Sequence, residues 1–249
     1  MYQVGIDIGS SAAKTVVLRD GEIWKTMEMA TGFSSRKTAD EIYEWLEKEQ
    51  VAGEGPRYGA TGYGRVSVPY ADKVITEITC HGKGAWKLFG KDGVVIDIGG
   101  QDTKGIVLKS GRVMKFVMND KCSAGTGKFL EVMTNRLGLT QKELSELASQ
   151  GKDVTISSMC TVFAESEVIS LIGKGTSRED IAYGVVESVA VKVAQLISQL
   201  GGNHYFLTGG LCEDEYVISR LSHALNAPVE SMPLARYAGA IGAALLSGE

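Results

Sequence analysis

The chain has little of several residues that define whole classes of protein. It holds four cysteines and three histidines in 249 residues, too few for a disulfide-stapled secreted domain, and a chain of this length can bury a core without staples. A net charge of -4, with no cluster of basic residues, argues against binding of nucleic acid through a basic face. The start, from Met1 to Ser10, has neither a basic segment nor a small-residue cleavage site. We therefore expect no signal peptide and a cytoplasmic location.

Long uncharged apolar runs are also lacking. A membrane span needs about 20 apolar residues, and Glu187 and Lys192 interrupt the longest helical candidate. We expect no membrane segment. In a reducing cytoplasm the four cysteines are not expected to form two structural disulfides, which leaves burial, redox chemistry or metal binding for each of them.

What the sequence does contain is an internal repeat. The segment from Val4 to Leu18 aligns without a gap on the segment from Val94 to Leu108. The identical positions include Ile6, Asp7, Ile8, Gly9, Lys14, Val17 and Leu18 in the first copy, and Ile96, Asp97, Ile98, Gly99, Lys104, Val107 and Leu108 in the second. Each copy predicts a buried strand, a turn that contains glycine, a second strand, and a third strand around Glu22–Glu28 or Arg112–Met118.

Helical patterns follow both copies. They are predicted at Thr38–Gln50, Glu77–Phe89, Ala124–Leu137, Thr140–Gln150, Val162–Ile172, Ser177–Leu200, Glu213–Leu225 and Tyr237–Leu246, with one further short strand at His204–Thr208. This order predicts an α/β fold of two duplicated βββαβα lobes with a cleft between them. We expect the first lobe at residues 1–90, joined by the C-terminal helix at 237–249, and the second lobe at 91–236.

In both copies an aspartate stands at the end of the first strand. Asp7 and Asp97 end a strand just before a glycine turn, so backbone N–H groups and a carboxylate meet where they can hold a phosphate chain and its Mg²⁺. Small residues, with one lysine, follow in the first copy, and glycines and an amide that could orient a water follow in the second. These candidates are Ser10, Ser11, Ala12, Ala13 and Lys14, then Gly99, Gly100 and Gln101.

A third glycine turn, Thr208-Gly209-Gly210, follows a strand and suits a nucleoside that lies against the backbone. The two homologous turns and this third one together resemble the acetate/sugar kinase, Hsp70 and actin superfamily. The resemblance implies actin-like, ribonuclease H-like lobes with ATP in the cleft, and catalytic roles for Asp7, Asp97 and Gln101. The alternative is that the glycines only make tight β-turns. Neither a Walker A pattern nor a Rossmann fingerprint is present.

The cysteines divide into two kinds. Cys122 and Cys160 each precede a predicted helix, where free N–H groups stabilise a thiolate or a bound anionic cluster. Cys80 falls in an apolar helix pattern and is expected in the core, while Cys212 could line the nucleotide pocket or simply pack. Two thiolates do not complete a [4Fe–4S] cluster, but a two-fold homodimer could supply four. A zinc site and a Cys–His nucleophile remain alternatives that no neighbouring motif supports.

Seven segments extend the resemblance over nearly the whole chain. They are Asp7-Ile-Gly-Ser10, Ala60-Thr-Gly-Tyr-Gly-Arg65, Ala71-Asp-Lys73, Glu77-Ile-Thr-Cys-His81, Ile96-Asp-Ile-Gly-Gly-Gln-Asp102, Asn119-Asp-Lys-Cys-Ser-Ala-Gly-Thr-Gly127 and Cys160-Thr-Val-Phe-Ala-Glu-Ser-Glu-Val168. With them the chain resembles the ATP-dependent activators of 2-hydroxyacyl-CoA dehydratases, the benzoyl-CoA reductase ATPase subunits and the reductases of double-cubane cluster proteins. Ser123 stands where the family pattern has Ala, and Arg236 where Gln is frequent.

The resemblance implies a homodimer with one [4Fe–4S] cluster, held by Cys122 and Cys160 of each subunit. It also implies that ATP or ADP contacts Ser10 to Lys14 and Gly99 to Gln101, with Gly209, Gly210, Cys212 and Arg236 around the adenosine and Asp7 and Asp97 on Mg²⁺. Members hydrolyse ATP to deliver one low-potential electron to a partner iron–sulfur enzyme. About 10 kcal/mol of nucleotide-linked free energy corresponds to roughly 400 mV for one electron.

Under this hypothesis ferredoxin or flavodoxin is the electron donor, and no nucleic acid or membrane takes part. One rival is a small ATP-dependent kinase of the same fold, in which the cysteines are structural. A nucleotide-dependent scaffold or actin-like polymer is another. Both rivals predict an iron-free protein.

Overall fold

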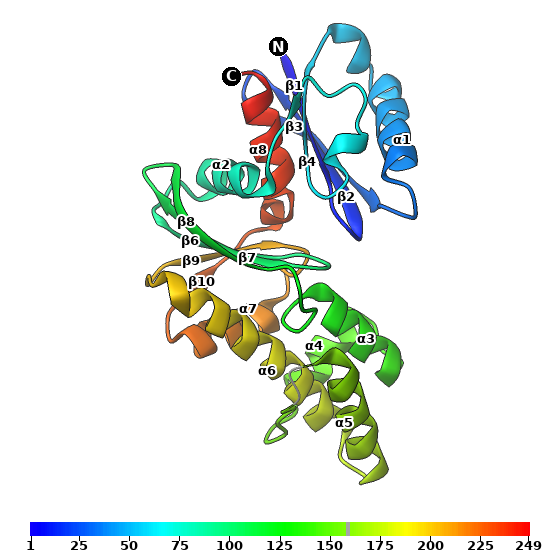
Figure 1. Ribbon diagram of the computed structural model, residues 1–249, viewed down its shortest axis with the longest axis vertical. Helices are drawn as coiled ribbons and strands as arrows, with labels where there is room; N and C mark the ends of the chain where they lie inside the picture. Colours follow the sequence, from blue (N-terminus) through cyan, green and yellow to red (C-terminus); the bar gives the residue numbers. More distant parts are fainter. Residues whose placement is uncertain (158–159) are drawn as a thin grey trace. The chain divides into compact units, whose positions relative to one another are not determined.

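The computed structural model describes residues 1–157 and 160–249, and this part of the chain forms two five-stranded sheets (Figure 1). The strands of the first sheet are β1 (Tyr2–Ile8), β2 (Ala12–Arg19), β3 (Glu22–Ala30), β4 (Arg57–Thr61) and β5 (Lys73–Val74). Those of the second are β6 (Gly93–Ile98), β7 (Thr103–Lys109), β8 (Arg112–Asn119), β9 (Tyr205–Gly209) and β10 (Val229–Glu230).

The sheets have equivalent strand orders. The first sheet runs β3-β2-β1-β4-β5, and the second runs β8-β7-β6-β9-β10. In the first sheet β1 pairs antiparallel with β2 and parallel with β4. The duplication seen over 15 residues of sequence therefore extends to whole sheets, and the predicted α/β fold is confirmed.

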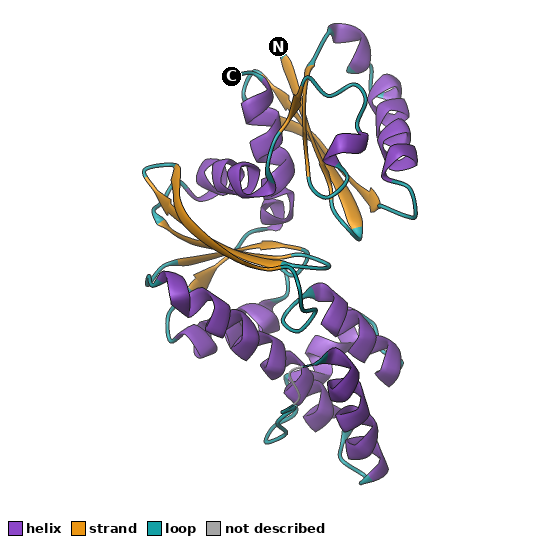
Figure 2. Ribbon diagram, in the orientation of Figure 1, coloured by secondary structure: helices purple, strands orange, loops and turns teal. Residues whose placement is uncertain are grey.

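Helices make up most of the rest (Figure 2). They are α1 (Ser35–Lys48), α2 (Glu77–Phe89), α3 (Gly127–Leu137), α4 (Gln141–Ala148), α5 (Thr161–Gly173), α6 (Arg178–Ile197), α7 (Glu215–Leu225) and α8 (Ala238–Ser247), with short 3-10 segments at Ala52–Glu54, Arg65–Ser67, Ser198–Leu200 and Pro233–Tyr237. At the start of α4, Thr140 and Glu143 form a capping box, and both of its reciprocal hydrogen bonds are present.

The chain forms two compact units. One consists of Met1–Val95, Ile106–Phe116 and Leu234–Glu249, and the other of Ile96–Gly105 and Val117–Pro233. In the first unit, α8 brings the end of the chain against β1 and β4. A side chain at Gly5 or Gly59 would collide with the backbone of α8, because its Cβ would lie 1.8 Å from the Ala240 carbonyl oxygen or 2.2 Å from that of Ala243. Glycine at these positions permits the close packing of helix on sheet.

Helix α6 is the central helix of the second unit and contacts α3, α4, α5 and α7. The segment Arg178–Leu200 is long and apolar enough to cross a membrane by length and composition alone, although Glu187 and Lys192 lie within it. Ile181, Val185 and Val189, for instance, are at most 1% exposed. Burial among four helices accounts for the apolar composition.

The expected start of one helix was wrong. Helix α3 begins at Gly127, not at Ala124, because Gly125 has a φ of +82° and Thr126 is extended as the N-cap. The first turn of α5 holds no acidic residue, since Glu165 comes only after it. The other predicted helices lie within a few residues of their expected bounds.

Candidate nucleotide and thiol sites

The first glycine turn surrounds the end of β1. Asp7 is opposite Lys14 on β2 and opposite Thr61 on β4, so a carboxylate, a lysine and a threonine lie in one row across the sheet. The Gly9 N–H donates to the Ala12 carbonyl over 3.1 Å and closes the turn. Ser10 and Ser11 are exposed, whereas Ala13 is buried in β2. The turn therefore presents backbone and small side chains to solvent beside a nearly buried carboxylate.

The second turn has the same hydrogen bond ninety residues later. The Gly99 N–H donates to the Asp102 carbonyl over 2.9 Å. Gly100 is half-buried and Gln101 is exposed at the tip of the turn. The repeat thus preserves the geometry of the turn as well as its sequence. Two equivalent phosphate-binding turns would need this shared geometry.

A buried ion network supports the second turn. Lys104 is 3% exposed, and its Nζ lies 2.7 Å from Asp102 Oδ2 and 3.5 Å from Asp97 Oδ2. The Thr208 hydroxyl donates to Asp97 Oδ1 over 3.0 Å. Lysine between two carboxylates compensates their buried charge and fixes their positions. The sequence alone assigned no role to Lys104 or Asp102. These residues are two positions apart, however, and side chains at that spacing in an extended segment point to the same face of the sheet.

Each unit also has a threonine-glycine pair at the end of its fourth strand. Gly62 (φ +87°) and Gly209 (φ +86°) occupy equivalent places, because a Cβ there would lie 2.4 Å from the Ile8 carbonyl oxygen or 2.5 Å from that of Ile98. The same Cβ atoms would lie 2.6 Å from Asp7 Oδ1 and 3.0 Å from Asp97 Oδ1. The dipeptides Thr61-Gly62 and Thr208-Gly209 are the sequence signal for this second level of the repeat.

A hollow of about 790 Å³ opens just after the Gly209-Gly210 turn. The whole length of α4, with the start of α7 and the residues just before it, lines the hollow, through Gln141, Lys142, Ser145, Glu146, Ser149, Glu213, Asp214, Glu215, Tyr216 and Ser219. Asp214 caps α7 and also accepts a hydrogen bond from the Ser145 hydroxyl over 2.5 Å, which joins the two helices. Gly210 is exposed and Cys212 is 1% exposed. Arg236 belongs to the other unit, where its guanidinium donates to Glu28 over 2.9 Å.

A histidine missed by the sequence reasoning lies beside Asp7. His81 on α2 is 5% exposed, and its Nε2 lies 3.8 Å from Asp7 Oδ2. Gly239 on α8 makes room for the pair: a Cβ there would lie 2.4 Å from Asp7 Oδ2 and 2.8 Å from His81 Nε2. The three residues come from β1, α2 and α8, so no local pattern could reveal the group.

The four cysteines are all free thiols, and their exposure separates them into pairs. Cys122 and Cys160 are exposed, whereas Cys80 and Cys212 are buried. Burial raises the pKa of the Cys80 thiol to about 12, which keeps it protonated and unreactive. Among residues 1–157 and 160–249 no group of three or more His, Cys, Asp or Glu could hold a metal ion.

Cys160 is the N-cap of α5, as expected, but Cys122 lies in a loop four residues before the N-cap of α3. The position predicted for Cys122 at a helix terminus was therefore wrong. Asn119 holds the loop instead: its side chain donates to the carbonyls of Cys122 and Ala124 over 2.7 and 3.1 Å, and accepts from the Cys122 N–H over 3.2 Å. An asparagine that mimics a backbone turn fixes a loop in this way.

One hydrogen bond joins the two cysteine segments. The Ser123 and Thr161 hydroxyls lie 2.7 Å apart, and each residue directly follows one of the exposed cysteines. Segments separated by 38 positions are thereby brought side by side. The arrangement can present two thiols at one surface of the second unit.

Comparisons with known proteins agree with this geometry. Residues 4–247 match the model of the BadF/BadG/BcrA/BcrD ATPase family. The (R)-2-hydroxyglutaryl-CoA dehydratase activating ATPase of Acidaminococcus fermentans is 44% identical over 250 residues, covering 98% of this chain and 96% of the relative. A crystal structure of the A. fermentans (R)-2-hydroxyglutaryl-CoA dehydratase component A matches with a TM-score of 0.94 and 42% identity, covering 100% of both chains.

Two further structures resemble the chain. The activator of 2-hydroxyisocaproyl-CoA dehydratase from Clostridium difficile, with bound ADPNP, has a TM-score of 0.92 and 36% identity, covering 99% of this chain and 94% of its own. A ROK-family glucokinase from Streptomyces griseus, with a TM-score of 0.63 and 17% identity over 99% of both chains, shares the actin-like fold alone. With a family match over nearly its whole length, the chain belongs to the BadF/BadG/BcrA/BcrD ATPase family.

Proposed function

We propose that this chain is an ATP-hydrolysing iron–sulfur protein that delivers a low-potential electron to a partner iron–sulfur enzyme, such as a 2-hydroxyacyl-CoA dehydratase or a double-cubane cluster protein. One observation carries the proposal: in an ATPase-family chain the two exposed thiols, Cys122 and Cys160, lie on segments joined by the Ser123–Thr161 hydrogen bond. The relatives described as dehydratase activators support the class of partner.

The donor set fits a cluster shared between two copies of the chain. A [4Fe–4S] cluster generally takes four thiolates, and two copies related by a two-fold axis would supply Cys122 and Cys160 twice. Beyond Cys160, α5 exposes apolar side chains that suit burial against a second copy: Val162, Phe163, Ile169 and Ile172 are 66, 67, 47 and 47% exposed. When bound, the cluster would accept one electron and pass it on.

The two glycine turns are the proposed nucleotide site. Ser10 to Lys14 and Gly99 to Gln101 would contact the phosphates of ATP or ADP, and Asp7 and Asp97 would hold Mg²⁺ through their carboxylates. Gln101, exposed at the tip of its turn, is suited to orient the attacking water. Gly209 and Gly210 would support the nucleoside, for which the hollow between α4 and α7 offers room. Contacts of Cys212 and Arg236 with the adenosine stay predictions of the resemblance.

Other parts of the proposal concern the surroundings of the protein. We place it in the cytoplasm, with ferredoxin or flavodoxin as the donor of the electron. Lobes at 1–90 with 237–249, and at 91–236, would bind the nucleotide together and change their arrangement on hydrolysis.

Anaerobic purification tests the proposal. We expect a brown protein with about four iron and four sulfide per two chains. The variants Cys122→Ala and Cys160→Ala should each lose the iron, whereas Cys80→Ala, which removes a buried thiol, should keep it. A folded, colourless and iron-free wild-type protein, purified anaerobically, contradicts the electron-transfer function and favours a kinase or scaffold.

A further inference from the structure

The helix that follows the Cys122 loop is attached to the second glycine turn. The Gly127 N–H donates to the Gly99 carbonyl over 2.9 Å, and the Lys128 N–H donates to the Gly100 carbonyl over 2.8 Å. No side chain caps α3, so these carbonyls satisfy N–H groups that a helix start leaves open. Any shift of Gly99 or Gly100 therefore acts directly on the start of α3.

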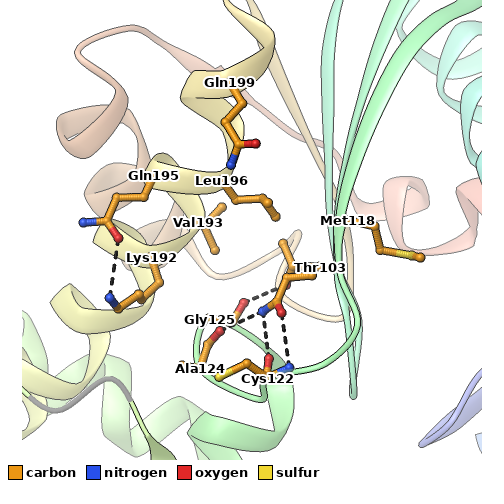
Figure 3. Close-up of a pocket in the computed structure, with 11 residues that line it drawn as sticks. Thr103, Met118, Cys122, Ala124, Gly125, Lys192, Val193, Gln195, Leu196 and Gln199 are labelled. Atoms are coloured by element: carbon orange, nitrogen blue, oxygen red, sulfur yellow. Dashed lines mark hydrogen bonds between the residues drawn. The ribbon is translucent and has the colours of Figure 1, made fainter.

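The Cys122 loop has its own attachment to the same turn. Thr103 directly follows Asp102, is 1% exposed, and donates its hydroxyl to the Gly125 carbonyl over 2.6 Å (Figure 3). Gly125 in turn adopts a φ of +82°, which fixes how the loop passes from Cys122 into α3. Loop and turn are thus held by a buried side-chain bond as well as by two backbone bonds.

The connection continues to Cys160. Within the loop, the Thr126 hydroxyl donates to the Ser123 carbonyl over 2.7 Å. The Ser123 hydroxyl then lies within hydrogen-bond distance, 2.7 Å, of the hydroxyl of Thr161, which directly follows Cys160. Contiguous hydrogen bonds therefore run from the Gly99–Asp102 turn to both exposed cysteines, all inside one compact unit.

The loop also has space beside it. A hollow of about 370 Å³ is lined by Cys122, Ala124 and Gly125 on the loop side, and by Lys192 and Gln195 on α6 and Gln199 in the 3-10 segment after it (Figure 3). A loop that borders a hollow can shift without expelling packed side chains. The hydrogen bonds to the turn and those from Asn119, more than packing against α6, then determine where Cys122 lies.

We propose that Thr103 is a positioning residue that couples nucleotide occupancy of the Gly99–Asp102 turn to the position of Cys122, and that Ser123 extends the coupling to Cys160. The proposal rests on the proposed function, because it takes the turn to be a phosphate site. Phosphate bound at the turn would hold Gly99 and Gly100, and through Thr103 it would hold the Cys122 loop in one arrangement.

Site-resolved alkylation of the full-length, metal-free chain tests the coupling. Iodoacetamide modification of Cys122 and Cys160 is followed by peptide mass spectrometry, with and without ADPNP and Mg²⁺. In the wild type, bound nucleotide should slow alkylation at both cysteines by about fivefold or more. Thr103→Val, which keeps the shape and removes the donor, should abolish this protection at Cys122, and Thr103→Ser should retain it.

Two variants separate the coupling from a general loss of order. Thr134→Val removes a hydroxyl that bonds only within α3, to the Glu131 carbonyl, and should behave like the wild type. Ser123→Ala should keep the protection at Cys122 and lose it at Cys160, and it provides a test even if Thr103→Val does not fold.

The possible failures are distinguishable. A wild type that binds ADPNP by calorimetry without any change at Cys122 contradicts the coupling and leaves the proposed function intact. Full protection in a folded Thr103→Val variant contradicts the role of Thr103. A wild type that binds no nucleotide contradicts the proposed function, and the coupling fails with it.

Discussion

Asp7 lies in a group of three residues from three elements. The His81 ring and the bare Cα of Gly239 enclose its Oδ2 atom, since His81 Nε2 is 3.8 Å away and a Cβ on Gly239 would be only 2.4 Å away. The orientation of this carboxylate therefore depends on the absence of a side chain on α8. If Asp7 serves the nucleotide as proposed, Gly239 matters to activity although it contacts no ligand.

Gly239→Ala tests this dependence. The new methyl group should displace the Asp7 carboxylate, lower the ATPase kcat by roughly tenfold or more, and cost about 1–3 kcal/mol of stability through overpacking. Steady-state ATPase assays and urea unfolding measure both effects. Gly53→Ala is the matched control, because a Cβ at Gly53 meets nothing within 4 Å, and it should leave both quantities unchanged. Wild-type kcat in Gly239→Ala would show that the position of Asp7 does not matter.

Lys104 is a buried cation that is expected to matter for stability. Its ammonium group compensates two nearly buried carboxylates, those of Asp97 and Asp102. Lys104→Met keeps most of the length of the side chain and removes the ammonium group that faces both carboxylates, so we expect a loss of about 3–5 kcal/mol in the free energy of unfolding. Lys109→Met on the same strand removes an exposed ammonium and should change stability by less than about 0.5 kcal/mol. Equal effects of the two variants in urea unfolding would refute this interpretation.

Among the elements, α4 is the clearest case of a helix whose start is specified locally. Thr140 caps the Glu143 N–H, and Glu143 accepts from the Thr140 N–H over 2.7 Å and from its hydroxyl over 2.8 Å. The backbone bond and then the side-chain bond lower the pKa of Glu143 below its usual value of 4.5. Because the folded pKa is depressed, the stabilisation by this carboxylate is present above pH 4.5 and is lost as the pH falls through the folded pKa.

Thr140→Ala removes the cap and one of these bonds. We expect a loss of about 1 kcal/mol at pH 7, measured by thermal unfolding, and a smaller difference from the wild type at a pH below 4. Lys142→Ala, on the exposed side of the same helix, is the control and should change stability little. A difference that stays the same or grows as the pH falls would argue against the reciprocal cap.

At the scale of the whole molecule, the exposed apolar face of α5 has a consequence for assembly. Under the proposed function this face meets a second copy beside the shared cluster. Phe163→Glu should then shift the protein from dimer to monomer and lower its iron content, as measured by light scattering and iron analysis. Phe33→Glu makes the same substitution at a fully exposed phenylalanine outside α5 and should leave the dimer intact. A dimer that persists in Phe163→Glu places the interface elsewhere.

Much of the architecture could be predicted from the sequence, for a local reason. The strand at Tyr2–Ile8 is buried without interruption from Val4 to Ile8, as its apolar run indicates, and the helix at Glu77–Phe89 has an apolar face that the 3.6-residue period reveals. Strands β5 and β10 are only two residues long, and both residues of β5 are exposed. Neither strand is therefore long enough to show a periodic pattern of apolar residues. Helix α3 was misplaced at its start because the conformation of Gly125 depends on the bond from Thr103.

The duplication, the two glycine turns and a candidate carboxylate at each can be read from the chain alone, because a repeat preserves apolar periods and turn residues along the sequence. The folded structure was needed to see that Cys212 is buried, that Gly239 and His81 enclose Asp7, and that Thr103 and Ser123 tie the cysteine segments to a turn. Burial and side-chain hydrogen bonds depend on which faces pack together. Partners far apart in sequence leave no local pattern, so the chain had to be folded before they could be found.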